Sequence, residues 1–280
     1  MRFRHVSLVS ALVAFVVSIA AIGALFAGRR WLWFGAGTAG VLLAVHIASH
    51  WTAVGLGGVS AIGFLWDRLH ARRSEHAPRT QGIVLHSALF YDLFAWVITR
   101  GKERVFRERT IEQAGIQPRE SVLDVGCGTG TLAIAAKQRV GESGKTCGID
   151  ASPEMIARAR NKARKAGLDL DFRNAVIEAL PFADGTFDTV LSTIMLHHLP
   201  DDVRRRGIRE MRRVLKPGGR LFVVDFGGDT KDRHAWGHRH RHGDFDLRRV
   251  IPEVNETGLK DVESGALGFR DLQFIRGTAP

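Results

Sequence analysis

Hydrophobic and polar residues are distributed in two different ways along this chain. Between Val6 and Trp66 the only Asp, Glu, Lys or Arg residues are Arg29 and Arg30, whereas charged residues are frequent from Asp67 onward. A long apolar stretch without charges is typical of membrane helices, and short apolar runs among charges are typical of a water-soluble domain. The pattern therefore predicts two parts that meet near position 67.

The first part has the features of a membrane anchor. Val6–Ala27 is an uncharged run of about 22 residues, which as a helix is long enough to cross a hydrocarbon core of ~30 Å. A cleaved signal peptide is the alternative, but a second apolar run, Trp31–Trp66, follows at once. Arginines near the ends of these runs support two spans and three spans equally, and both arrangements place the chain from Arg68 onward in the cytoplasm. We expect residues 1–67 to be an integral membrane anchor with two spans.

The second part shows apolar strands that alternate with amphipathic helices. Strands are expected at Ser121–Val125, Thr146–Ile149, Leu170–Arg173, Phe187–Ser192 and Arg220–Asp225. Helices are expected at Leu132–Val140, Glu154–Ala166, Asp201–Leu215 and Leu247–Thr257. Strands that alternate with helices form a parallel sheet covered on both faces. The predicted fold is α/β, a Rossmann-like, mostly parallel sheet preceded by an α-helical transmembrane anchor.

The boundaries of this second part follow from local signals. Residues 68–82 are polar and contain Pro78, which predicts a linker, and residues 83–280 form the globular domain. Within it, helical apolar spacing predicts cap helices over 83–118, ahead of a ligand-binding core at 119–226. Residues 227–280 are expected to complete the sheet and act as a lid over a second ligand. Ser152 and Pro153 look like an N-cap and first helical residue, and Lys216–Gly219 looks like a turn.

A glycine loop follows the first predicted strand and is the strongest chemical signal in the chain. Gly126, Gly128 and Gly130 allow a tight turn and a close approach of the backbone to a ligand. Asp150 ends the next strand, where a carboxylate can accept hydrogen bonds from both hydroxyls of a ribose. A nicotinamide dinucleotide would also suit such a site. However, a buried acid at Asp124 would repel a pyrophosphate and suits the cationic end of a sulfonium cofactor.

Three other patterns suggest ligand sites that we interpret differently. Gly35–Gly40 matches the dinucleotide pattern G-x-G-x-x-G, but it lies in a membrane segment and indicates close helix packing. His46 and His50 have a spacing that suits a metal, but no third ligand is in view. In His234–His242, histidine alternates with arginine without a cysteine or carboxylate pair, which favours a basic lid or a lipid-headgroup contact over a metal site. We predict no metal.

Four segments occur together in the order found in one enzyme family. They are Val122–Gly130 (VLDVGCGTG), Leu180–Phe182 (LPF), Phe187–Asp188 (FD) and Arg213–Arg220 (RVLKPGGR). In combination they resemble class I S-adenosylmethionine-dependent methyltransferases, and most of all the branch of ubiquinone/menaquinone-biosynthesis and phosphatidylethanolamine N-methyltransferase-like enzymes. The resemblance covers roughly Leu85 to Asp225 and does not extend to the membrane segment. It implies S-adenosyl-L-methionine as the cofactor and methyl transfer as the activity.

The resemblance also implies a set of cofactor-binding residues. They are Asp124, Gly126, Cys127, Gly128, Gly130, Asp150, Ala151, Val176, Ile177 and Thr193. The glycine loop would line the methionine part, Asp150 would hold the ribose, and the backbone of Ile177 would meet the adenine. Many relatives carry Asp or Asn where Val176 stands. Adenine recognition here is therefore expected to rest on the backbone or on Glu178.

Candidates for the acceptor side are Tyr91 and His197. Methyl transfer from a sulfonium is an in-line displacement, and it needs a base only when the acceptor loses a proton. Tyr91 lies in the helical segment before the sheet, and His197 follows the fourth strand. We hypothesise that the two flank the transferring methyl group; the alternatives are a core aromatic and an ordinary loop histidine.

Overall charge narrows the choice of partners. A net charge of +11 suits either nucleic acid or an anionic lipid surface, but the chain has a single Tyr and shows no aromatic-and-basic RNA-binding motif. Together with the apolar N-terminus, this predicts a membrane partner and no nucleic acid.

The predicted function is methylation of a small, lipophilic acceptor such as a quinone precursor or a phospholipid amine. A cofactor-binding scaffold without turnover and a nicotinamide oxidoreductase are the alternatives, and the oligomeric state stays open.

Overall fold

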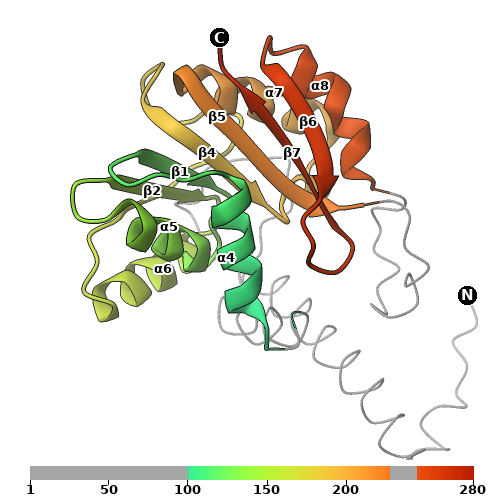
Figure 1. The fold of residues 1–280 in the computed structure, drawn as a ribbon. Coiled ribbons are helices and arrows are strands. Elements are labelled where there is room, and N and C mark those ends of the chain that lie inside the picture. The colour runs from blue at the N-terminus through green and yellow to red at the C-terminus, as the bar shows by residue number, and fades with distance from the viewer. Residues whose placement is uncertain (1–98, 100, 228–244) are drawn as a thin grey trace, which may run out of the picture. The chain divides into compact units, whose positions relative to one another are not determined.

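The computed structural model describes Thr99 and residues 101–227 and 245–280 (Figure 1). The predicted anchor, the linker, Tyr91 and the segment His234–His242 lie outside the described residues. Within the described ranges, no helix is both long enough and apolar enough to cross a membrane.

A seven-stranded sheet in the order β3-β2-β1-β4-β5-β7-β6 forms the centre of the domain (Figure 1). Its strands are β1 (Ser121–Val125), β2 (Lys145–Asp150), β3 (Asp171–Asn174), β4 (Phe187–Thr193), β5 (Leu215–Phe226), β6 (Lys260–Ala266) and β7 (Leu272–Thr278). Neighbouring strands among β1 to β5 run parallel, while β7 is antiparallel to both β5 and β6. The mostly parallel, Rossmann-like sheet predicted from the sequence is confirmed.

Helices cover both faces of this sheet. They are α4 (Glu103–Gln113), α5 (Thr131–Val140), α6 (Pro153–Lys165), α7 (Asp201–Arg213) and α8 (Ile251–Asn255), with short 3₁₀ helices η1 (Leu196–His198) and η2 (Leu247–Val250). Figure 1 shows α4, α5 and α6 on one face and α7 and α8 on the other. Successive side chains of β1 point to opposite faces of the sheet. Val122 lies in the core cluster with residues of α4 and α5, and Leu123 lies in the cluster with residues of α7 and α8.

The structure reproduces the predicted start of α6 and the predicted burial of β1. The Ser152 hydroxyl accepts a hydrogen bond from the Met155 N–H at 3.2 Å, and Pro153 opens α6. The N-cap and first-residue assignment is therefore confirmed. In β1, Val122, Leu123 and Val125 are all fully buried, as expected for a central strand covered on both faces.

Two predicted elements are wrong in detail. Lys216–Gly219 is not a free turn but part of β5, because the Gly218 N–H donates to the Ala279 carbonyl and the Ala279 N–H donates to the Gly219 carbonyl, each at 2.8 Å. This segment shifts the register of β5 against β4, between Phe187 and Thr189. The helix expected over Leu247–Thr257 is divided into η2 and α8, with Pro252 in the first turn of α8.

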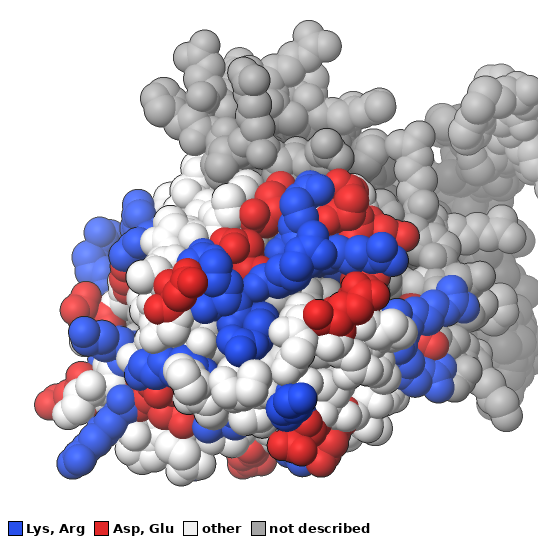
Figure 2. Space-filling view, turned by 90° about the horizontal axis from the view of Figure 1, so that it is seen from above, with Lys and Arg blue, Asp and Glu red and all other residues white. Residues whose placement is uncertain are grey.

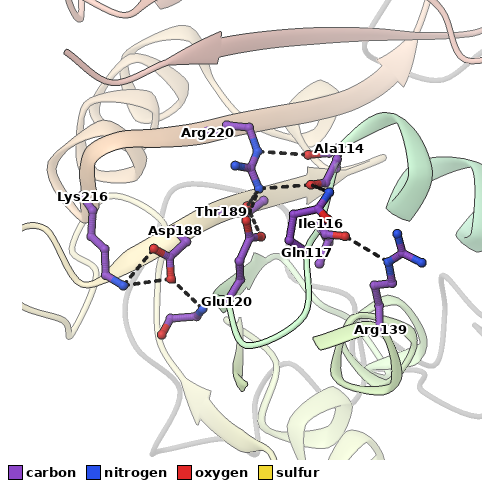
Figure 3. Close-up of polar contacts among 11 residues, drawn as sticks. Ala114, Ile116, Gln117, Glu120, Arg139, Asp188, Thr189, Lys216 and Arg220 are labelled. Atoms are coloured by element: carbon purple, nitrogen blue, oxygen red, sulfur yellow. Dashed lines mark hydrogen bonds and ion pairs between the residues drawn. The ribbon is translucent and has the colours of Figure 1, made fainter. Parts of the chain in front are cut away.

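The amino ends of the central strands are joined by a network of charged groups (Figure 3). Basic and acidic side chains also lie intermixed on the face of the molecule that Figure 2 shows. Asp188 accepts hydrogen bonds from the Ser121 N–H and the Lys216 ammonium, each at 2.8 Å to Oδ2. Arg220 binds Glu120 and also donates to the Thr189 hydroxyl at 2.8 Å. These contacts fasten β1, β4 and β5 to one another at this edge. The candidate site residues lie at the opposite, carboxyl edge, where ligands bind in open α/β sheets.

Candidate functional site

The glycine loop joins β1 to α5 in a conformation that other residues rarely adopt. Gly126, Gly128 and Gly130 have φ angles of 74°, 52° and 79°. Space is also restricted, because a Cβ on Gly130 would lie 2.8 Å from the side chains of Ala159 and Phe172. The loop is therefore fixed between β1 and α6.

Asp150 is held against this loop by two backbone donors. Its Oδ2 accepts from the Gly128 N–H and its Oδ1 from the Ser152 N–H, both at 2.9 Å. These bonds orient the carboxylate at the carboxyl end of β2, beside the partly exposed Ala151. Because a carboxylate oxygen can accept more than one hydrogen bond, a carboxylate at this position suits the hydroxyls of a ribose.

Asp124 is buried in β1, one residue before the end of the strand. Among the described residues, neither of its carboxyl oxygens makes a hydrogen bond of ordinary geometry. Burial raises its pKa from 3.8 to about 7; the negative charge of Asp150 adds to this, while the charge of Arg107 and the Ala133 N–H oppose it. A buried acid that makes no hydrogen bond of ordinary geometry within the described residues suits a cationic group, such as the ammonium of the cofactor's methionine part.

The side chain of Cys127 packs into the protein core. Its sulfur lies in the layer beside Gly148, where a Cβ on that glycine would come within 3.0 Å. Burial raises the pKa of the Cys127 thiol well above its ordinary value, so the group stays protonated and inert. Any contact of Cys127 with a cofactor would therefore be made by its backbone.

The segment after β3 contains the residues that the sequence predicts to meet the adenine. The Ile177 side chain packs against α7, since a Cβ on Gly207 would lie 2.4 Å from Ile177 Cγ1, and this leaves its backbone for a ligand. Val176 is partly buried and offers no polar group. Glu178 Oε2 is buried without a hydrogen-bond partner among the described residues, so it is an acceptor available to an adenine amino group.

A strained turn follows β4 at the carboxyl edge of the sheet. Thr193 ends the strand and is buried, and Ile194 has a φ of 52°, which is rare for a β-branched residue. The Ile194 N–H is bonded to the Val224 carbonyl at 2.8 Å, which holds the turn in place. The turn places Met195 over Gly126, where a Cβ would lie 2.6 Å from Met195 Cγ.

The same turn places His197 beside Asp225, which the sequence analysis did not identify. His197 Nδ1 lies 2.8 Å from Asp225 Oδ1, and the His197 N–H donates to Oδ2 at 3.2 Å. Asp225 is fully buried near the end of β5. Because a carboxylate only accepts hydrogen bonds, Nδ1 carries the proton and Nε2 is left as the basic nitrogen. Asp225 could have been predicted from the sequence, because it is an acidic residue at the carboxyl end of a strand that neighbours β4.

Among the described residues, His197 is in contact with several aromatic rings. Its ring lies edge-on to Phe226 at 5.0 Å and to Phe245 at 6.1 Å between centroids, and 3.9 Å from the His198 ring. Tyr91, its proposed partner, lies outside the described residues. In the described ranges, no three His, Cys, Asp or Glu residues lie close enough together to hold a metal ion.

Comparisons with known proteins agree with this geometry. A family model described as "Methyltransferase domain" matches residues 122–219. The ubiquinone/menaquinone biosynthesis C-methyltransferase of Klebsiella pneumoniae is 33% identical over 184 residues, which are 65% of this chain and 70% of that protein. The corresponding enzyme of Cronobacter sakazakii is 34% identical over the same shares.

Solved structures show the same fold. A SAM-dependent methyltransferase from Aquifex aeolicus has a TM-score of 0.54 at 22% identity, over 62% of this chain and 89% of that one. The PH0226 protein from Pyrococcus horikoshii has a TM-score of 0.55 at 20% identity, over 68% and 98%. With S-adenosyl-L-methionine as its cofactor, the chain is an enzyme rather than a nicotinamide oxidoreductase or a scaffold. It belongs to the class I S-adenosylmethionine-dependent methyltransferases and is related to the ubiquinone/menaquinone biosynthesis C-methyltransferases.

Proposed function

We propose that this chain is a membrane-anchored methyltransferase that transfers a methyl group to a ring carbon of a small, lipophilic quinol-type acceptor. Two independent lines support the proposal. The relatives are C-methyltransferases of quinone biosynthesis. The carboxyl edge of the sheet carries an oriented base, His197, and this is the observation that carries the chemistry.

The cofactor, when bound, supplies a methyl group already activated on a sulfonium. The residues around it serve to hold and orient it. Asp150 would bind the ribose, the loop Gly126–Gly130 would follow the methionine part, and Glu178 would accept from the adenine amino group. Such fixation lowers the barrier because the reacting groups are already aligned and water is excluded.

Carbon methylation needs a base, and this requirement separates it from simple methylation of a free amine. The S–methyl bond breaks, a C–C bond forms, and the acceptor loses one proton overall. Removal of the proton from a ring hydroxyl makes the neighbouring ring carbon a stronger nucleophile. We assign this step to His197 Nε2, with Asp225 holding the ring and stabilising the imidazolium that forms. Tyr91 is proposed to flank the methyl group from the cap.

The location proposed for the enzyme rests on the sequence. Two long uncharged runs within residues 1–67 support an integral membrane anchor, and the arginine distribution supports a catalytic domain in the cytoplasm. An anchor of this kind would keep the crevice near the bilayer. It would thereby raise the local concentration of an acceptor that dissolves in the membrane.

Labelling of membrane lipids tests the proposal. Membranes that contain the full chain are incubated with methyl-labelled S-adenosylmethionine, and the lipid extract is separated into quinone and phospholipid fractions. We expect label in the quinone fraction, and its loss in His197→Ala but not in the neighbouring control His198→Ala. Label in the phospholipid fraction would instead show that an amine is the acceptor. Equal labelling by wild type and His197→Ala would remove the role assigned to His197.

A further inference from the structure

Two of the sequence motifs that mark the family are joined by one arginine side chain. The motifs are Leu180–Phe182, in the segment after β3, and Arg213–Arg220, which begins at the last residue of α7. Arg213 reaches from the second motif to the first. Its Nη2 donates to the Leu180 carbonyl at 3.1 Å and its Nη1 donates to the Phe182 carbonyl at 2.8 Å. A guanidinium carries several donors in one plane, so a single side chain can hold both carbonyls.

Glu210, one turn earlier on α7, completes a clamp on the same segment. Its Oε2 accepts from the Leu180 N–H at 2.9 Å, and each of its oxygens accepts from Arg213 at 2.7 Å. The N–H and the carbonyl of Leu180 are therefore both bonded to one ion pair. Arg213 Nη1 also donates to the exposed Asp184 at 2.7 Å. Hydrogen bonds of this kind, in which one or both groups are charged, are stronger than bonds between neutral groups.

Ile177 gives the segment a further contact with α7. It packs against the helix at Gly207, where an added Cβ would lie 2.4 Å from Ile177 Cγ1. Gly207, Glu210 and Arg213 follow one another at intervals of three residues, so they meet the segment along one side of the helix. The stretch from Ile177 to Leu180 is thereby attached to α7 at both of its ends.

A second arginine touches this segment in a more exposed position. Arg173 of β3 donates to the Pro181 carbonyl at 3.0 Å, and its guanidinium lies 4.6 Å from the centre of the Phe182 ring. Its side chain is 45% exposed, against 30% for Arg213, and it makes no printed contact with Leu180. The firmer attachment of the stretch is therefore the one that Arg213 and Glu210 provide.

Glu178 lies within the attached stretch. Its Oε2 is buried and makes no hydrogen bond within the described residues. The proposed function, on which this inference rests, gives this oxygen the adenine amino group as its donor. A binding group whose position is already fixed loses less freedom when the ligand arrives. We propose that Arg213 is a positioning residue for the cofactor: it holds the turn that carries Glu178 and thereby sets the preference for adenine over a base without the amino group.

Calorimetric titration of the full-length chain tests this role without any acceptor, so a failure of the proposed quinol methylation would leave the result unaffected. The ligands are S-adenosylmethionine and its analogue with purine in place of adenine, which lacks the amino group. The variant Arg213→Gln is compared with Lys216→Gln. Lys216 belongs to the same motif, but its ammonium binds Asp188 at 2.8 Å at the amino edge of the sheet (Figure 3). Both variants break an ion pair, and only Arg213→Gln releases the segment that carries Glu178.

We expect the wild type to bind S-adenosylmethionine at least about tenfold more tightly than the purine analogue. Arg213→Gln should reduce this preference to less than about threefold, mainly through weaker binding of S-adenosylmethionine. Lys216→Gln should keep the preference of the wild type, even where it lowers the free energy of unfolding. The same preference in all three proteins would overturn the role assigned to Arg213, and so would a wild type without any preference.

The variant Arg213→Lys covers the case in which Arg213→Gln does not fold. Lysine keeps the positive charge beside Glu210, but a point charge does not reproduce the planar set of donors that holds two carbonyls and two carboxylates. The preference for S-adenosylmethionine over the purine analogue should therefore fall several-fold in Arg213→Lys. An unchanged preference in this variant would count against the proposal.

Discussion

The imidazole of His197 lies 2.8 Å from the carboxylate of Asp225, Nδ1 to Oδ1, although the two residues are 28 positions apart. They meet because β4 and β5 are parallel neighbours whose carboxyl ends are in register, with Thr193 opposite Val224. The strained Ile194 turn then returns the chain over β5. This contact fixes the orientation of the His197 ring and supports the proposal that His197 acts as the base.

Replacement of the orienting carboxylate should impair turnover without impairing cofactor binding. In Asp225→Asn the new amide can donate to Nδ1, which favours the tautomer whose Nε2 carries the proton and cannot accept another. We expect kcat on a quinol acceptor to fall about a hundredfold, with the KM for S-adenosylmethionine nearly unchanged. Steady-state kinetics measure both. A rise in KM at constant kcat would show that Asp225 serves the cofactor site instead.

Binding of the cofactor should depend on the protonation of Asp124. Burial, aided by the negative charge of Asp150, raises the pKa of Asp124 to about 7 against the opposing effects of Arg107 and the Ala133 N–H. The cofactor's ammonium pairs with the ionised form, so affinity should increase up to pH 7, by about one power of ten per pH unit below it. Titration calorimetry between about pH 5.5 and 7.5 measures this slope. Asp124→Asn should bind weakly and without the slope, and a flat wild-type profile would refute the coupling.

The same group should affect the stability of the cofactor-free enzyme in the opposite direction. A carboxyl whose folded pKa is raised above 3.8 holds its proton more tightly in the folded state than in the unfolded state. Its contribution is therefore fully present below about pH 4 and is lost as the pH rises through about 7. Urea unfolding of wild type and Asp124→Asn should show a difference between the two that changes across this window. A difference that is constant with pH would contradict the assignment.

Close packing around Gly130 should make an added methyl group damaging. In Gly130→Ala the new Cβ would lie 2.8 Å from Ala159 Cβ and Phe172 Cζ, at a φ of 79°. We expect a loss of about 3 kcal/mol of unfolding free energy and weak cofactor binding. Gly167→Ala is the matched control, since its φ is 67° but nothing lies within 4 Å, and it should cost about 1 kcal/mol. Equal costs would show that backbone strain alone accounts for the effect.

Breaking the buried pair between α7 and α8 should destabilise the domain. Arg204 Nη2 lies 2.7 Å from Glu253 Oε1 and its Nε lies 3.0 Å from Oε2, with both side chains buried. Glu253→Gln would remove the buried one of the two carboxylates that pair with Arg204 and leave only the exposed Asp201 at 3.0 Å. We expect a loss of about 3 kcal/mol in urea unfolding. Arg206→Gln, which breaks an exposed pair with Asp202, should have no measurable effect. Similar results for both variants would refute a special role for burial.

Local signals explain which parts of the domain could be predicted from the sequence. The glycine loop, Asp150 and the central strands follow from glycine spacing and runs of buried residues, which act over a few positions. Lys216–Gly219 could not be read correctly because its partner, Ala279, lies at the far end of the chain. Asp225 was missed for a related reason. Its significance depends on which strand lies beside it, and the sequence pattern alone does not specify such neighbours.

The chemical position of the transferred methyl group tests the proposed function most directly. Membranes with the full-length enzyme, a quinol acceptor that lacks the methyl group and ¹³C-methyl-labelled S-adenosylmethionine are incubated together, and the lipid product is analysed by NMR. We predict one new methyl group bonded to a ring carbon, formed by the wild type and nearly absent in His197→Ala. A labelled methyl group on oxygen or nitrogen, or no label in the quinol at all, would contradict carbon methylation of a lipophilic acceptor.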